Sequence, residues 1–320
     1  MTYKAIDPRI VAAFDKSHDF SFEKSCVMLC YVGSKSHNTY VPSTDKDAID
    51  DVDLMGVVIP PEDYTIGLKT FEHWTFKQDE LDVVVYSMDK FVRLLVKSNP
   101  NVLGTLWMKP SMYLKTSLVW NWLVNARTHF ATKAAFGAFA GYAQGQQHRM
   151  TALTPEIQAE MAQLEAELET AGWHLQDVMD KRSVPMPKGM STEDANTKAD
   201  RLRKLRARYH AAYQGEKRRN LVMKHSYDTK NAAHLVRLLR MCTEFLATGE
   251  MQVWRVNDAE TYRAIKRGEW TLERVKEEAD SLYELAKVAK ELSTLPKDVD
   301  IDAVSKLLVT IMQEHYGWYE

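Results

Sequence analysis

The chain has 320 residues, of which 45% are hydrophobic and 27% charged, with a formal net charge of −2. These proportions are those of an ordinary soluble globular protein, and the length suggests about two domains. The charge gives no global sign of nucleic-acid binding, so any such binding has to come from local clusters of charge.

Cysteines and the start of the chain bear on its location. Cys26, Cys30 and Cys242 are an odd number without the pairing of metal ligands, and the first two are too far apart on one extended strand to form a disulfide. We therefore expect buried free thiols in a reducing compartment. The first residues lack an apolar signal core and no apolar run could span a bilayer, so we expect a cytoplasmic protein with no membrane partner.

The first predicted elements are one helix and three strands. Ile10, Val11 and Phe14 stand at helical spacing in residues 6–16. Residues 27–32 and 54–59 are short apolar runs that end in turn residues, as buried strands of a mixed sheet do, and a third such run covers residues 81–86.

Five residues around these strands predict a metal and phosphate site. Asp51 and Asp53 would share one face of the second strand because side chains alternate along a strand, and Asp82 begins the third. Three converging carboxylates repel each other unless a cation lies among them, and oxygen ligands suit Mg²⁺ or Mn²⁺ together with substrate phosphates. Gly33 allows backbone N–H groups to approach an anion closely, and Ser34 adds a hydroxyl donor.

Residues 62–80 are predicted to be an irregular connection that carries four aromatic residues, Tyr64, Phe71, Trp74 and Phe76. These side chains could form a wall on which bases stack, or they could cover the edge of the sheet. The second interpretation is favoured, because aromatic residues supply core area far more often than ligand contacts.

The chain then becomes helical. Ser87 is a good N-cap for a helix that extends to about Lys97, and Pro100 is suited to the first turn of the next helix. Asn99 and Asn101 fit either a capping role or a contact with substrate.

Residues 118–150 are predicted to form one or two helices. Tyr142, Gln146 and Arg149 stand there at i, i+4 and i+7, on one stripe. An aromatic ring, an amide and a guanidinium suit a nucleotide, although the same pattern fits a solvated helix face.

Residues 155–214 predict an antiparallel helical hairpin, because two heptad seams flank a break rich in proline and glycine. The seams consist of Ile157, Met161, Leu164, Leu168, Ala171, Leu175 and Val178, then Leu202, Leu205, Tyr209 and Ala212. The first arm is acidic and the second basic, so the basic side chains could be neutralised inside the hairpin.

Residues 198–240 nevertheless hold thirteen Lys and Arg against three acids. Lys230, His234 and Arg237 stand at i, i+4 and i+7 on one helix, where they could neutralise a triphosphate or a polynucleotide backbone. A lone histidine such as His234 is more often structural than catalytic. The remaining residues, 251–320, are interpreted as scaffold, with caps at Thr271 and at Asp300 or Asp302 and with Leu285 facing inward.

The combination of Gly33-Ser34, Asp51-x-Asp53 and Asp82 resembles the hallmark of the DNA polymerase β nucleotidyltransferase superfamily. More closely, the chain resembles the bacterial and phage family of predicted nucleotidyltransferases (YcgL-like). That resemblance also takes in residues 99–103, 141–149, 227–240 and 267–275. The loop before Asp51 departs from the pattern because it is longer and more acidic, with Asp45, Asp47 and Asp50, so Asp50 competes with Asp51 as the first metal ligand.

The resemblance implies an α+β fold. A polymerase-β-like catalytic domain with a mixed sheet would occupy residues 1–115, and a mostly α-helical domain that contains the hairpin would occupy residues 116–320. It also implies transfer of a nucleoside monophosphate from a nucleoside triphosphate such as ATP to an acceptor hydroxyl, with Mg²⁺ or Mn²⁺ as cofactor and release of pyrophosphate.

The resemblance and the patterns together assign site residues. The catalytic and metal-binding residues would be Asp51, Asp53 and Asp82, and the nucleotide-binding residues would be Gly33, Ser34, Tyr142, Gln146, Arg149, Lys230, His234 and Arg237. RNA, such as a tRNA end, is the favoured acceptor because of the basic helices. A protein side chain or a small molecule is the alternative acceptor, and a non-catalytic nucleotide or nucleic-acid binding module is a third interpretation.

Overall fold

The computed structural model describes residues 6–42, 50–151, 154–212 and 216–318, with the side chains of residues 209–219 left undescribed. The chain divides into two compact units. The first consists of Met1–Ala143, Leu235–Ala264 and Lys276–Glu320, and the second of Gln144–His234 and Ile265–Val275. The predicted domain boundary after residue 115 falls inside the first unit.

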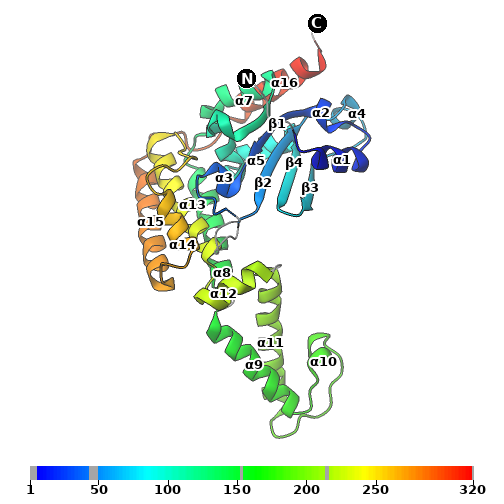
Figure 1. The fold of residues 1–320 in the computed structure, drawn as a ribbon, viewed down its shortest axis with the longest axis vertical. Coiled ribbons are helices and arrows are strands. Elements are labelled where there is room, and N and C mark those ends of the chain that lie inside the picture. The colour runs from blue at the N-terminus through cyan, green and yellow to red at the C-terminus, as the bar shows by residue number, and fades with distance from the viewer. Residues whose placement is uncertain (1–5, 43–49, 152–153, 213–215, 319–320) are drawn as a thin grey trace. The chain divides into compact units, whose positions relative to one another are not determined.

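A five-stranded mixed sheet lies at the centre of the first unit (Figure 1). Its strands are β1 Cys26–Tyr31, β2 Val52–Val58, β3 His73–Gln78, β4 Leu81–Ser87 and β5 Tyr113–Thr116, in the order β3-β4-β2-β1-β5. Among these five strands, only the pair β2 and β4 is parallel. The predicted mixed sheet is therefore confirmed.

One face of the sheet packs against the N-terminal segment. α1 Pro8–Ser17 buries Ile10 and Phe14 there, together with aromatic residues of the segment that follows β2. That segment contains α4 Glu62–Thr65 and the edge strand β3, so the expectation of an irregular connection is wrong. Trp74 and Phe76 alternate with polar residues along β3 and pack on this core, which confirms the covering interpretation.

Helices cover the other face of the sheet. They include α5 Met88–Val96, α6 Pro100–Leu103, α7 Leu118–Asn125, α13 Thr229–Thr248 and α16 Ile301–Tyr316. Met55 and Val57 of β2 meet Phe91, Trp120 and Phe245 in this core, all at most 3% exposed. This face is the one that carries Asp53 and Asp82, since they alternate in phase with Met55 and Val84.

Caps fix several of these helices. The Asn99 side chain accepts from the Asn101 N–H at 3.0 Å, so the capping interpretation is confirmed for Asn99. Asp300 caps α16, and Thr271 accepts from Arg274 N–H at the start of α15 Leu272–Leu292. Leu285 is 54% exposed rather than inward, because the buried stripe of α15 passes through its neighbour in sequence, at position 286.

The second unit contains the predicted helical hairpin. Its arms are α9 Pro155–Thr170 and α11 Thr192–Ala212, which lie side by side (Figure 1). The first seam does not continue in one helix to Val178, because the chain turns at Gly172 with φ +83° and enters the short α10 Leu175–Met179. Leu168, Val178 and Leu202 still share one small core.

The remaining helices are short connections or supports. They are α2 Phe22–Ser25, α3 Gly33–Ser36, α8 Ala135–Met150, α12 Glu216–His225 and α14 Ala259–Lys266, with 3₁₀ turns at Gly104–Trp107, Pro110–Met112 and Arg127–Phe130. No helix among the described residues is long and apolar enough to cross a membrane. The three cysteines are buried and free as predicted, and burial raises the pKa of Cys26 and of Cys242 to about 12.

Candidate active site

Two of the predicted catalytic aspartates lie directly opposite each other. Asp53 on β2 pairs in register with Asp82 on β4, so both side chains project from the same face at the beginning of two parallel strands. Asp51 immediately precedes β2, two residues before Asp53, and the Val52 N–H donates to the Glu80 carbonyl at 2.7 Å to hold this end of the strand. The sheet thus brings the three carboxylates together at one end of β2 and β4.

The glycine-serine turn after β1 packs against this end of β2. The Val32 N–H donates to the Asp53 carbonyl at 2.9 Å, and Gly33 follows with φ +60°. A Cβ atom on Gly33 would lie 2.1 Å from Asp53 Oδ2, so any side chain there would displace the Asp53 carboxylate. Glycine is therefore required both by the left-handed backbone and by the carboxylate beside it.

The Ser34 hydroxyl is a second feature of this turn. Its Oγ is buried and has no hydrogen-bond partner among the described residues. A buried hydroxyl without a partner is costly, by about 1–3 kcal/mol, and such groups in native proteins call for an explanation. A bound anionic group that accepts this hydrogen bond would supply one.

A lysine that sequence reasoning misses lies among the carboxylates. Lys77 on β3 pairs in register with Asp82, and its Nζ lies 3.1 Å from Asp82 Oδ2 and 3.9 Å from Asp51 Oδ2. The hydrogen bond to Asp82, with the charges of Asp51 and Asp53, raises the pKa of Lys77. The prediction of an irregular segment here hides this residue, although the alternation of residues 73–77 is a signal that could have revealed it.

The donor set fits a hard divalent cation held together with phosphate. The carboxylate oxygens of Asp51, Asp53 and Asp82 are the ligands that Mg²⁺ and Mn²⁺ prefer, and the buried Ser34 hydroxyl suits a phosphate beside them. As placed around Lys77, however, the described residues include no group of three or more His, Cys, Asp or Glu arranged to hold a metal ion. The residue types fit such a cation, and Lys77 supplies the positive charge among them.

The competition between Asp50 and Asp51 has a geometric aspect. Asp50 is 9% exposed, and its Oδ2 accepts from the Val41 N–H at 2.9 Å, across the loop that separates the two residues. Asp51 instead approaches Lys77 on the side of Asp82. The geometry favours Asp51 as the carboxylate that belongs with Asp53 and Asp82. The additional acids Asp45 and Asp47 lie outside the described residues.

Tyr142 and Arg237 belong to the same unit as the carboxylates. Tyr142 is half-buried on α8, and its hydroxyl accepts from Asn99 Nδ2 at 2.7 Å. Burial lowers the pKa of Arg237 on α13 to about 10. Its Nη1 makes a weak contact with Met241 Sδ at 3.7 Å, and no described carboxylate forms an ion pair with it.

The other four predicted nucleotide-binding residues lie in the second unit. Gln146 is buried on α8, whereas Arg149 is exposed, so the predicted stripe is not one evenly accessible face. Lys230 and His234, near the start of α13, are half-buried. Their part in nucleotide binding stays a prediction.

The basic arm of the hairpin is largely neutralised from within. Ion pairs join the two arms: Lys198 with Glu167 at 2.7 Å, Arg201 with Glu160 at 2.7 Å and Arg206 with Glu165 at 2.6 Å. This confirms the predicted pairing of opposite charges. These three cations are therefore poor candidates for a nucleic-acid contact.

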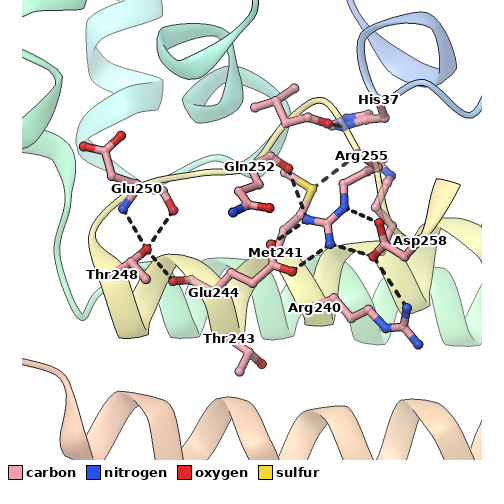
Figure 2. A network of polar contacts seen from close by, with 12 residues as sticks. His37, Arg240, Met241, Thr243, Glu244, Thr248, Glu250, Gln252, Arg255 and Asp258 are labelled. Atoms are coloured by element: carbon pink, nitrogen blue, oxygen red, sulfur yellow. Dashed lines mark hydrogen bonds and ion pairs between the residues drawn. The ribbon is translucent and has the colours of Figure 1, made fainter.

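A second feature missed from sequence anchors the segment that follows the glycine-serine turn. Arg255 N–H donates to the His37 carbonyl at 3.3 Å, and Asn38 Nδ2 donates to the Arg255 carbonyl at 2.9 Å. The Arg255 guanidinium, 5% exposed, lies between Glu244 at 2.5 Å and Asp258 at 2.6 Å (Figure 2). No local pattern could reveal this network, because its members are up to 221 residues apart in the sequence.

The sequence model of the RlaP family, described as "RNA repair pathway DNA polymerase beta family", matches residues 8–170, just over half of the chain. The chain belongs to the RlaP family. The matched part contains all five strands and the three aspartates, and it confirms the resemblance to polymerase-β-like nucleotidyltransferases.

This RlaP-family chain was also compared with solved structures and with curated proteins. It is similar to the crystal structure of a nucleotidyltransferase-like protein from Exiguobacterium sibiricum, at 10% identity, with 96% of this chain and 78% of that chain covered and a TM-score of 0.24. The search of curated proteins gave no match.

Proposed function

We propose that this RlaP-family protein is a metal-dependent nucleotidyltransferase that moves a nucleoside monophosphate from a nucleoside triphosphate to a hydroxyl of RNA. The proposal rests on the contact of Gly33 with Asp53 and on the register that sets Asp53 opposite Asp82, at one end of β2 and β4. The description of the family as one of an RNA repair pathway supports RNA as the acceptor.

The residues at this end of the strands take distinct roles in the proposal. Asp51 and Asp53 would hold Mg²⁺ or Mn²⁺ on the triphosphate, and Asp82 would hold it on the side of the acceptor. Divalent cations there would stabilise the negative charge on the attacking and leaving oxygens. Gly33 would let the β- and γ-phosphates approach the backbone, and Ser34 Oγ, buried without a described partner, would donate to them.

The chemical step is an in-line displacement at the α-phosphorus. The acceptor oxygen forms a bond to that phosphorus, while the bond to the oxygen bridging the α- and β-phosphates breaks and pyrophosphate leaves with the electron pair. Asp82 would orient the acceptor hydroxyl or take its proton. Phosphoryl transfer depends mainly on positioning and charge neutralisation, so little other chemistry is required of the chain.

Lys77 is compatible with this proposal. Its side chain is 64% exposed and has a flexible aliphatic chain, so its ammonium group can move away from Asp82 when a divalent cation binds. Until then it lowers the repulsion among the three carboxylates.

The predicted nucleotide contacts complete the proposal. Arg237 is the best supported, because a desolvated guanidinium without a described carboxylate partner would gain most from a phosphate. Tyr142 would offer a ring to the base. From the second unit, we assign the remaining contacts to Gln146, Arg149, Lys230 and His234.

The test is incubation with nucleoside triphosphates labelled at the α-phosphate, Mg²⁺, and either total cell RNA or total cell protein. We expect label in RNA. An Asp53→Asn variant that melts like the original protein should transfer none, whereas Asp302→Asn, which removes an exposed carboxylate on α16, should transfer normally. Full activity of folded Asp53→Asn would overturn the active-site assignment, and label in protein alone would overturn RNA as the acceptor.

A further inference from the structure

A cavity of about 300 Å³ lies beside the turn that follows β1, apart from the carboxylates. Its walls carry three aromatic rings, of Tyr31, Tyr40 and Trp254, and two cations, Lys35 and Arg263. None of the described residues that line it is acidic. Its volume is at the lower end of the range for ligand pockets.

The cations of this pocket lie against its aromatic rings. Lys35 Nζ is 4.9 Å from the ring centroid of Tyr31 and 5.1 Å from that of Tyr40, and no described carboxylate pairs with it. Lys109 Nζ lies 4.0 Å from the ring centroid of Trp254. Arg263 forms an ion pair with the exposed Glu260 at 2.8 Å, so its charge is partly neutralised. A lysine ammonium therefore lies over each of the three aromatic rings.

The walls of the pocket are held in place by hydrogen bonds between distant segments. Arg263 Nη2 donates to the Asn38 carbonyl at 2.6 Å, and His37 Nδ1 lies 2.9 Å from the Val253 carbonyl oxygen. The Arg255 network ties the same two segments together (Figure 2). A binding site that is already formed loses little conformational entropy when a ligand enters.

The position of the pocket separates it from the proposed triphosphate site. Tyr31 packs with the core on the α1 face of the sheet, whereas Asp53 projects from the opposite face. Lys35 follows Ser34 directly in α3, so the two sites share this turn of the chain. A ligand in the pocket would thus be distinct from the nucleotide whose triphosphate meets the carboxylates.

We propose that this pocket binds one nucleotide of a single-stranded RNA, with its base stacked on Tyr31, Tyr40 or Trp254 and its phosphate on Lys35 and Arg263. Aromatic rings interleaved with cations are how proteins bind single-stranded nucleic acid without strict sequence preference. The inference rests on the proposed function in that the RNA is the acceptor strand. Binding in the pocket does not itself require transfer.

The experiment measures the affinity for a short fluorescein-labelled single-stranded oligoribonucleotide by anisotropy, without Mg²⁺ or nucleoside triphosphate. Trp254→Leu and Lys35→Met should each weaken binding about tenfold, as loss of one stacking or phosphate contact does. The matched controls are Trp318→Leu, a half-buried tryptophan stacked on Tyr316, and Lys290→Met, a lysine 5.1 Å over the Phe136 ring. Both controls should bind as tightly as the original protein, and thermal melts check that all four variants fold.

Unlabelled ATP in the same assay distinguishes RNA from a free nucleotide. If Trp254→Leu and Lys35→Met weaken the binding of ATP and leave that of RNA unchanged, the pocket belongs to a free nucleotide and the RNA assignment is overturned. Unchanged binding of both ligands overturns the pocket altogether. RNA binding that depends on the pocket in a protein that transfers no label would overturn the proposed function alone.

Discussion

Gly33 is a position at which the candidate site tolerates little change. Its backbone is left-handed, and a methyl group there would collide with the carboxylate of Asp53. We expect Gly33→Ala to lose transfer activity and to lower the free energy of unfolding by about 1–2 kcal/mol or more, since the left-handed backbone alone carries that penalty for a residue with a Cβ.

Gly137→Ala is the matched control for this prediction. Gly137 lies inside α8, and a methyl group at this position would have no neighbouring atom within 4 Å, so alanine should raise the free energy of unfolding by about 0.5–1 kcal/mol and leave transfer unchanged. Urea unfolding and the labelled-nucleotide assay measure both effects. An active Gly33→Ala protein with unchanged stability would mean that the turn does not press on Asp53.

Single residues of the site differ in how far the sequence could reveal them. Asp51 and Asp53 could be placed together from alternation along one strand, whereas the position of Asp82 beside them depends on the register of β2 with β4. Lys77 was not identified, because the exposed edge strand that carries it lacks a continuous apolar run. Arg255 has no signal of its own, since an arginine in a polar loop is usually solvated.

At the scale of elements, local periodicity explains what could be predicted. The hairpin arms follow heptad steps, which depend only on neighbours in the sequence, and α9 and α11 form as expected. The end of α9 depends instead on the backbone of Gly172, which the heptad pattern cannot reveal. Likewise, β3 forms because β4 offers it a hydrogen-bonding edge, a partner that residues 62–80 do not show by themselves.

The hairpin core provides a test at this scale. Leu202 is fully buried among Leu168, Trp173 and Val178, so Leu202→Ala should destabilise the hairpin by about 2–5 kcal/mol. Hydrogen exchange read by mass spectrometry should then lose protection in residues 155–212, while the strands of the sheet keep theirs. Leu285→Ala, at an exposed leucine of α15, should change exchange little. Equal loss of protection in the sheet would show that the hairpin does not unfold as a separate element.

At the scale of the whole molecule, the first unit is assembled from segments far apart in the chain. Residues 37–38 follow the glycine-serine turn, whereas residues 244–263 lie more than 200 positions later, and the Arg255 network joins them (Figure 2). Three of the five strands and several helices could be predicted, but the contact of residues 244–263 with the segment after the glycine-serine turn could not. Such contacts depend on the assembled fold, and neither segment has a periodic sequence pattern that predicts them.

The Arg255 network makes stability depend on pH. Burial by itself would raise the pKa of Asp258, but hydrogen bonds from Arg255 and Tyr262 outweigh it and hold that pKa below its usual value. A carboxyl whose pKa is lower in the folded protein stabilises the fold above its unfolded pKa of about 3.9, and this contribution is lost as the pH falls through the lower, folded pKa. Replacing Arg255 removes the interaction and leaves Asp258 and Glu244 without their shared cation.

We therefore expect Arg255→Met to lower the free energy of unfolding by about 3–5 kcal/mol at pH 7, as loss of one partner of a buried ion pair does. The difference from the original protein should narrow as the pH falls below about 4, because Asp258 is then protonated more readily in the variant. Urea unfolding at pH 7, 5 and 3.5 measures this trend. Arg9→Met, which removes a more exposed arginine paired with Asp7, should have a much smaller effect. A constant difference across this range, or one no larger than that of Arg9→Met, would mean that the network does not stabilise the return of the chain to the site.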